Sequence, residues 1–247
     1  MRDSDQPVIV LTGANGGVGV ELARYLLRAR VGTLALTFRS RNDEILNVLR
    51  EFDLEPERCL FQVDLSAEDQ ARKLRLDVEG RLGLPYAVIN LAGASTNALS
   101  WKMTVGTFES VVRDNLLSTF LCCREFIPGM RERGAGRIIN ISSVVASIGR
   151  AGASHYAAAK AGIEGFTRSM ALELAPKSIT ANAIALGYFQ YGLINHLSAE
   201  LQNSIREQIP LKRFGNCSEI GGLVTFLLSE AGAYTTGQVI HVNGGLC

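Results

Sequence analysis

The chain has 247 residues, of which 47% are hydrophobic and 20% charged, and its formal net charge is +1. These values suit one large α/β domain or two small ones, and the balanced charge argues against nucleic acid or an anionic membrane as a partner. The five cysteines lack metal-ligand spacing, no secretion signal precedes the first strand, and no apolar run could span a bilayer. We therefore expect a cytoplasmic protein with free thiols and no bound metal.

Short apolar runs alternate with longer amphipathic segments along the chain. The predicted strands are 8–12, 33–38, 59–63, 87–90, 137–142, 180–185 and 239–242, and the predicted helices are 18–30, 43–52, 67–82, 107–133, 156–174 and 218–228. This alternation predicts right-handed βαβ units and a sheet buried on both faces. We expect a single α/β domain over 1–247, Rossmann-like and doubly wound, with seven parallel strands and helices on both faces. The segment at about 187–215 breaks the alternation and is interpreted as a lid-like insertion.

The first predicted strand leads into the sequence TGANGGVG at 12–19, and a helical pattern follows. Glycines allow a tight turn and a close approach of the backbone to a pyrophosphate, while the helix N-terminus offers N–H groups and a positive dipole end. A glycine cluster alone often means only a loop. Its position between the first strand and the first helix favours a nucleotide site.

The second predicted strand ends in TFRSR at 37–41, without an acidic residue. In dinucleotide-binding folds an acid here binds the ribose 2′-hydroxyl of NAD, whereas a basic residue accommodates the 2′-phosphate of NADP. Arg39 offers a bidentate fork and Ser40 a hydroxyl donor, which favours NADP(H). The alternative is that Arg39 and Arg41 are solvated loop residues.

Tyr156 and Lys160 lie four positions apart in a predicted helix and so share one face. A buried ammonium beside a phenol favours the phenolate and lowers the tyrosine pKa, which would let the side chain exchange protons near neutral pH. The alternative is an ordinary solvated helix face.

These motifs, with NLAG at 90–93, Asn115, Ser143 and the final NGG at 243–245, resemble the short-chain dehydrogenase/reductase family over essentially the whole chain. The resemblance implies four catalytic residues: Asn115, Ser143, Tyr156 and Lys160. It also implies these cofactor contacts: Gly13, Asn15, Gly16, Val18, Gly19, Arg39, Ser40, Asp64, Leu65, Asn90, Ala92, Gly93, Tyr156, Lys160, Gly187 and Phe189. Asp64 would meet the adenine amino group, or cap the following helix.

The resemblance further implies hydride transfer between a nicotinamide and a carbonyl carbon. Tyr156 would protonate the developing alkoxide, Lys160 would hold the nicotinamide ribose, and Ser143 would stabilise the carbonyl oxygen. Asn115 would hold a water that links Lys160 to solvent. Alone, Ser143 could be a turn serine and Asn115 a packing amide.

The chain departs from the family after the sixth predicted strand, where it reads ALGYFQY at 185–191. Leu186 replaces the usual proline, and Tyr191 stands where the family has threonine. We therefore expect a shifted lid and an aromatic pocket wall formed by Tyr188, Phe189 and Tyr191, which would suit an extended, conjugated or aromatic substrate.

The strongest resemblance is to 3-oxoacyl-acyl-carrier-protein reductases, which implies an NADPH-dependent reductase of carrier-linked 3-oxoacyl thioesters. The acidic carrier predicts a basic patch near the pocket, to which four arginines could contribute: Arg131, Arg133, Arg137 and Arg168. The alternatives are an NADP-dependent dehydrogenase of free alcohols, sugars or cyclic ketones, and a non-catalytic nucleotide-binding subunit. The resemblance also implies a homotetramer built through the two long helices and the C-terminal strand and helix.

The remaining candidates have less specific interpretations. His155 is predicted to be structural, His241 to be a core histidine, and His196 to lie at the surface or touch substrate. Cys122 and Cys123 are predicted to be packing residues. Trp101 and Met103 could line the pocket mouth or lie at a subunit contact.

Overall fold

A single parallel sheet forms the centre of the computed structural model, which describes residues 6–40, 43–192, 194 and 197–247. Its strands are β1 (Val8–Leu11), β2 (Thr33–Phe38), β3 (Leu60–Gln62), β4 (Pro85–Asn90), β5 (Gly136–Ser143), β6 (Ile179–Leu186) and β7 (Val239–Val242). They follow the order β3-β2-β1-β4-β5-β6-β7, and every neighbouring pair is parallel. The predicted seven-stranded parallel α/β fold is confirmed.

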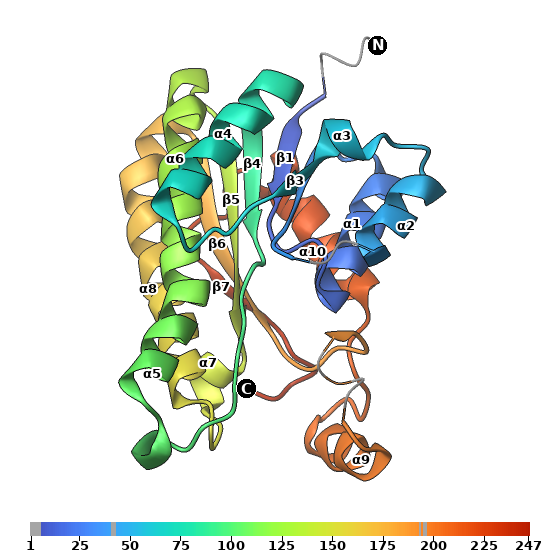
Figure 1. The fold of residues 1–247 in the computed structure, drawn as a ribbon, viewed down its shortest axis with the longest axis vertical. Coiled ribbons are helices and arrows are strands. Elements are labelled where there is room, and N and C mark those ends of the chain that lie inside the picture. The colour runs from blue at the N-terminus through green and yellow to red at the C-terminus, as the bar shows by residue number, and fades with distance from the viewer. Residues whose placement is uncertain (1–5, 41–42, 193, 195–196) are drawn as a thin grey trace.

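Helices cover both faces of the sheet (Figure 1). One face carries α1 (Gly17–Ala29), α2 (Asp43–Glu51) and α10 (Cys217–Leu228), and the other carries α4 (Glu68–Leu82), α6 (Ser118–Arg133) and α8 (Ser154–Leu174). Shorter helices complete the fold: α3 (Pro56–Cys59), α5 (Val105–Val112), α7 (Val145–Ile148) and α9 (Ala199–Gln208). Among the described helices, none combines the length and apolarity needed to cross a membrane.

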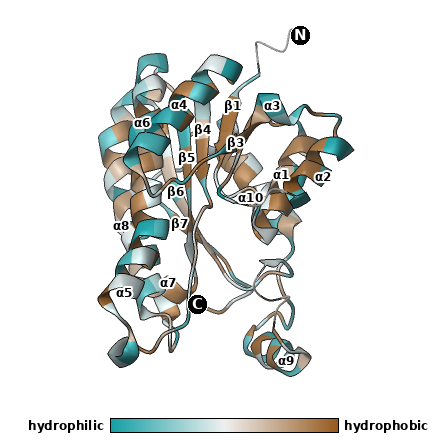
Figure 2. Ribbon diagram, viewed as in Figure 1, coloured by the Kyte–Doolittle hydropathy of each residue, from teal (hydrophilic) through white to brown (hydrophobic). Residues whose placement is uncertain are grey.

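Two apolar cores lie on opposite faces of the sheet. Alternate strand residues enter different cores, so that Ile9 and Leu11 pack on the α1 side while Val8 and Val10 pack on the α6 side. Because both faces are buried, the central strands are apolar throughout, which is visible as brown arrows in Figure 2. The same pattern made these strands recognisable in the sequence.

Two predicted elements differ in detail from the structure. The third strand was expected from residue 59 but begins at Leu60, because Pro56 starts the short helix α3, where its missing N–H costs nothing. The long helix expected over 107–133 consists of α5, a π-helical turn over Arg113–Leu117, and α6.

The described part of the segment over 187–215 lies beside the ends of the strands and includes helix α9 (Figure 1). Ile194, Ile209 and Phe214 form its buried centre, and Ser198 caps α9 by accepting a hydrogen bond from the backbone N–H of Leu201. Its return limb pairs with the start of the segment through a parallel bridge between Phe189 and Gly215. A lid-like movement of this segment stays a prediction.

Candidate active site

A cavity of about 820 Å³ lies at the carboxyl ends of the central strands. In doubly wound sheets ligands bind at this edge, where the strand order changes direction. Here that point lies between β1 and β4, since the chain passes from β1 outward to β3 and then returns to β4. The cavity walls come from the glycine turn, the ends of β2, β4, β5 and β6, the start of α8, and the segment that follows β6.

The glycine turn is built for close backbone contact. Gly13 has φ +67°, and a Cβ there would lie 2.8 Å from the Cα of Ala92, so only glycine fits. The Thr12 hydroxyl holds the two turns together by accepting hydrogen bonds from the backbone N–H groups of Leu91 and Ala92, both at 3.0 Å. Helix α1 begins with no side-chain cap and no acidic residue in its first turn, so its N–H groups and dipole are available to an anion.

The structure brings most of the expected cofactor residues to this cavity. The glycine turn, the end of β2, the β3–α4 loop, the β4 turn and the segment after β6 all contribute. The expected residues that line it are Gly13, Asn15, Gly16, Val18, Gly19, Arg39, Ser40, Asp64, Leu65, Ala92, Gly93, Tyr156, Lys160, Gly187 and Phe189.

Asn90 is not among the described residues that line the cavity, and its expected contact with the cofactor stays a prediction. The residue is buried, and its amide Nδ2 donates to Asn140 Oδ1 at 2.8 Å and to Cys123 Sγ at 3.2 Å. Asn140 in turn donates to the hydroxyl of Thr167. Asn90 therefore ties β4 to β5 and α6 beneath the cavity, and Cys122 and Cys123 are buried packing residues as predicted.

One end of the cavity carries the charged groups expected to meet an adenosine. Asp64 accepts hydrogen bonds from the backbone N–H and hydroxyl of Ser66, at 3.0 and 2.8 Å. Burial works against the ionised carboxyl, but these bonds and the charge of Arg39 outweigh it, and the pKa of Asp64 is lowered. The N-cap of α4 is Ala67, so the alternative of Asp64 as a helix cap is wrong.

At the other end of the cavity, Ser143, Tyr156 and Lys160 lie together. Ser143 ends β5, whereas Tyr156 and Lys160 occupy the first two turns of α8, which packs against β5. The Nζ atom of Lys160 donates a 2.8 Å hydrogen bond to the carbonyl of Ile141 and lies 5.5 Å from the centre of the Tyr156 ring. Lys160 is only 3% exposed, so the alternative of a solvated helix face is wrong.

Burial dominates the titration of this pair. It lowers the pKa of Lys160 to about 8 and raises the pKa of Tyr156, while a hydrogen bond with Ser143 and the charge of Arg150 partly oppose the rise. The expected lowering of the Tyr156 pKa by Lys160 is therefore wrong for the protein without a bound cofactor. Desolvation of the phenol outweighs the hydrogen bond with Ser143 and the charge of Arg150.

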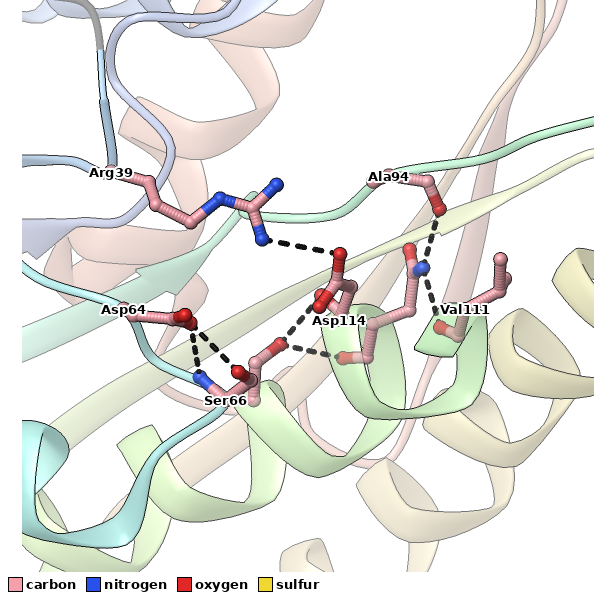
Figure 3. A network of polar contacts seen from close by, with 8 residues as sticks. Arg39, Asp64, Ser66, Ala94, Val111 and Asp114 are labelled. Carbon is pink, nitrogen blue, oxygen red and sulfur yellow. Dashed lines mark hydrogen bonds and ion pairs between the residues drawn. The ribbon is translucent and has the colours of Figure 1, made fainter. Parts of the chain in front are cut away.

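Asn115 lies within the π-helical turn and is fully buried. Its Nδ2 donates to the carbonyls of Ala94 and Val111, at 2.7 and 2.8 Å (Figure 3), whereas its Oδ1 has no hydrogen-bond partner among the described residues. A Cβ on Gly93 would collide with that Oδ1 and lie 3.5 Å from the Nζ of Lys160. A buried acceptor without a partner thus lies near the lysine ammonium, and such an atom is commonly satisfied by a bound water molecule.

The segment after β6 contributes to the cavity wall and meets the glycine turn, where a Cβ on Gly17 would collide with the backbone of Gly192. The expected aromatic residues Tyr188, Phe189 and Tyr191 all line the cavity, together with Leu186 and apolar side chains of the lid segment. This arrangement confirms the predicted aromatic wall.

Two charged cavity residues were not anticipated from the sequence. Arg150 lines the cavity near Tyr156, and its Nη2 donates to Asn97 Oδ1 at 2.9 Å. Asp114 forms an ion pair with Arg39. The sequence could have pointed to both residues through their neighbours. Arg150 stands six residues before Tyr156, and Asp114 stands directly before Asn115.

Several other expectations need correction. His241 is exposed, with Nδ1 3.3 Å from Cys247 Sγ, because β7 is the edge strand. Arg137 is 4% exposed and its guanidinium lies 5.4 Å from the ring centre of Tyr86, so it contributes to no surface patch. Arg131 and Arg133 end α6 just before the chain enters β5 at its amino end, and hence lie at the edge opposite the cavity.

Other predicted residues have the following positions. His155 is buried with its Nε2 3.4 Å from the Thr96 hydroxyl, in agreement with a structural role. Trp101 is 79% exposed and, like Met103, is not among the described residues that line the cavity. Arg41 and His196 lie outside the described residues. No group of metal-ligating side chains occurs within the described part of the chain.

Known proteins with similar sequences cover nearly all of this chain. A family model described as enoyl-(acyl carrier protein) reductase matches residues 13–247. The 3-oxoacyl-[acyl-carrier-protein] reductase FabG of Staphylococcus epidermidis is 34% identical over 96% of this chain and 97% of its own length. The Pseudomonas aeruginosa FabG is 36% identical, over 97% of this chain and 96% of its own length. Nodulation protein G of Azospirillum brasilense is 34% identical, over 98% of both chains.

These similarities agree with the parallel sheet, the glycine turn and the serine, tyrosine and lysine at the end of one cavity. The match extends from the glycine turn to the last residue of the chain. The chain therefore belongs to the short-chain dehydrogenase/reductase family and is an oxidoreductase of the FabG-like type.

Proposed function

We propose that this protein reduces a 3-oxoacyl thioester, carried on an acyl carrier protein, to the 3-hydroxyacyl form at the expense of NADPH. The observation that carries the proposal is the grouping of Ser143, Tyr156 and Lys160 at one end of a cavity whose other end holds the glycine turn and Arg39. The names of the FabG relatives support the substrate class. Tyr188, which lines the cavity with apolar side chains of the lid segment, offers surface to the acyl chain.

The residues present fit a nicotinamide dinucleotide. The uncapped start of α1 and the close approach at Gly13 suit a pyrophosphate, and the unpartnered Oδ1 of Asn115 marks a polar space beside Lys160. When bound, the cofactor supplies the hydride for the carbonyl carbon. Ser143 and Tyr156 would donate hydrogen bonds to the carbonyl oxygen, and the Tyr156 proton would pass to that oxygen as negative charge develops on it.

Lys160 would then restore the proton on Tyr156. Its pKa of about 8 suits a group that gives and regains protons near neutrality. A water held by the free Oδ1 of Asn115 would return the proton from solvent. The main-chain carbonyl of Asn115 accepts hydrogen bonds from Ser118 and Thr119, so the side-chain oxygen is the acceptor available for this water.

We also propose that the protein acts in the cytoplasm as a homotetramer. Apolar side chains remain exposed on the long helices, including Phe108 on α5, Phe120 on α6 and Leu172 on α8. A contact between subunits across these helices would bury them. Sedimentation or light scattering of the purified protein tests the tetramer.

The test of function is the oxidation of NADPH at 340 nm with an acetoacetyl thioester, run beside NADH, a panel of free ketones and a 2-enoyl thioester. Turnover with the 3-oxo thioester supports the proposal. Turnover only with free cyclic or aromatic ketones would transfer the assignment to a dehydrogenase of free carbonyl compounds, for which the aromatic wall is also suited. Reduction of the enoyl thioester alone would contradict carbonyl reduction, and cofactor binding without turnover would indicate a non-catalytic subunit.

A further inference from the structure

An ion pair lies across the adenosine end of the cavity. Nη1 of Arg39, at the end of β2, is 3.2 Å from Oδ2 of Asp114, in the π-helical turn before α6 (Figure 3). Both residues line the cavity. They stand 75 positions apart in the chain, so the contact joins the two walls of the site.

Neighbouring side chains hold the backbone at both ends of this pair. The carbonyl of Arg39 accepts a 3.1 Å hydrogen bond from the side-chain amide of Gln62 on β3. The Ser118 hydroxyl donates to the carbonyls of Asp114 and Asn115, at 2.8 and 3.1 Å, and so fixes the π-helical turn. The Asp114 side chain is 22% exposed, against 56% for Arg39, so the carboxylate is the more confined partner.

Two acidic side chains among the described residues interact with the guanidinium of Arg39. Besides its ion pair with Asp114, Arg39 exerts a favourable electrostatic effect on Asp64 across the same end of the cavity. A 2′-phosphate brings about two further negative charges to Arg39. It would have to share the guanidinium with the Asp114 carboxylate and would be repelled by it.

We propose that Asp114 is a specificity-determining residue that weakens the preference of this protein for the 2′-phosphorylated cofactor. Its carboxylate competes with the 2′-phosphate for Arg39, and it accepts a hydrogen bond from the free 2′-hydroxyl of the unphosphorylated cofactor. Asp114 thus supplies, from the opposite wall, the acid that is missing at the end of β2. The inference rests on the proposed nicotinamide dinucleotide site.

The test compares Asp114→Asn with wild type in direct binding titrations of NADPH and NADH, followed by intrinsic fluorescence or calorimetry without substrate. We expect the dissociation constant of NADPH to fall about fivefold in the variant, and that of NADH to stay constant or rise, because one repulsive charge is removed from a solvent-screened site. Competition by 2′,5′-ADP and 5′-AMP localises the change: only the first fragment should gain affinity.

Glu109→Gln is the matched control. It removes one negative charge from α5, in the turn before the π-helical segment, at an exposed residue that is not among those described as lining the cavity. It should leave the ratio of NADPH to NADH affinity unchanged. Thermal unfolding of both variants should match wild type, because each substitution keeps the size of the side chain.

Weaker binding of NADPH by Asp114→Asn would mean that the carboxylate positions Arg39 for the phosphate, and would overturn the inference. Equal shifts for both cofactors, or the same shift in Glu109→Gln, would also overturn it. If the binding ratio changes as expected while no thioester is reduced, the inference holds and the proposed substrate is refuted. If wild type binds neither cofactor, the proposed function and the inference are both refuted.

Discussion

The Nζ atom of Lys160 lies 5.5 Å from the centre of the Tyr156 ring and is anchored to the carbonyl of Ile141 on β5. Lys160 therefore lies beside Tyr156 on one face of helix α8, and its hydrogen bond to Ile141 fixes it to the sheet. Only one of its three donors is used by this carbonyl, so the others remain for cofactor hydroxyls or water. The pair combines a firmly held cation with a proton donor at the end of the cavity.

Replacing Tyr156 with Phe tests the proposed acid. The substitution removes only the hydroxyl, so we expect NADPH binding to be retained while kcat for thioester reduction falls by about 100-fold or more. Stopped-flow or steady-state rates, with cofactor titrations on the same preparation, measure both quantities. Turnover close to that of wild type would contradict the role of the phenol.

Arg150→Gln tests the electrostatic environment of Tyr156. The charge of Arg150 partly opposes the rise in the tyrosine pKa caused by burial, so its removal should raise that pKa further. Oxidation of a 3-hydroxyacyl thioester requires the deprotonated tyrosine, and its rate increases with pH through this pKa. The rising limb of the pH–rate profile should therefore move to higher pH in the variant.

Two further measurements test whether the charge of Arg150 moves the pH–rate profile. Because Arg150 is exposed, salt should reduce the difference between the variant and wild type. Arg168→Gln, on helix α8 with Tyr156 but outside the described lining of the cavity, should leave the profile in place. A movement of the limb to lower pH would show that Arg150 acts in another way.

The sheet and the catalytic end were predictable because their signals are local. Buried parallel strands are continuous apolar runs, the glycine turn is a contiguous motif, and Tyr156 and Lys160 are related by one helical turn. The backbone contacts that require Gly13 then follow from the meeting of β1 and β4.

The features that could not be predicted from the sequence depend on the orientation of side chains and on contacts between residues far apart in the chain. A helical pattern does not reveal a π-helical turn, and so the approach of Asp114 to Arg39 was not foreseen. Asn90 belongs to a recognisable motif, but its side chain enters a network with Asn140 and not the cavity. Arg131 and Arg133 do not contribute to the expected basic patch, because helix α6 carries them to the edge of the sheet opposite the cavity, and the patch itself stays a prediction.

The buried lysine predicts a specific dependence of stability on pH. The pKa of Lys160 is lowered by burial to about 8, from an ordinary value of 10.5. Between these values the unfolded chain binds more protons than the folded protein, so this residue makes stability rise with pH, by up to about 1.4 kcal/mol per pH unit. Below pH 8 both states are protonated and the contribution is constant.

Lys160→Met removes this titration and serves as the reference. The free energy of unfolding of wild type minus that of the variant, from urea denaturation, should increase from pH 8 to pH 10 and be flat from pH 6 to pH 7.5. Above pH 10 the raised pKa of Tyr156 lowers the stability of each protein, because the unfolded tyrosine loses its proton first, and this contribution cancels from the difference. A difference that is constant over the whole range would show that Lys160 titrates normally.

Two glycine substitutions distinguish the proposed proton path from general stability. In Gly93→Ala the new Cβ would collide with Oδ1 of Asn115 beside Lys160, whereas in Gly165→Ala, on α8, it would meet nothing within 4 Å. We expect Gly93→Ala to lower kcat about tenfold or more by displacing the amide and its water, with the affinity for 2′,5′-ADP unchanged. Gly165→Ala should keep full activity and raise the free energy of unfolding by about 0.5–1 kcal/mol.

If Gly93→Ala keeps the wild-type kcat, the space between Asn115 and Lys160 has no part in proton transfer. If it loses 2′,5′-ADP affinity to the same extent as kcat, the damage extends along the whole cavity and the assignment of Asn115 to proton transfer fails.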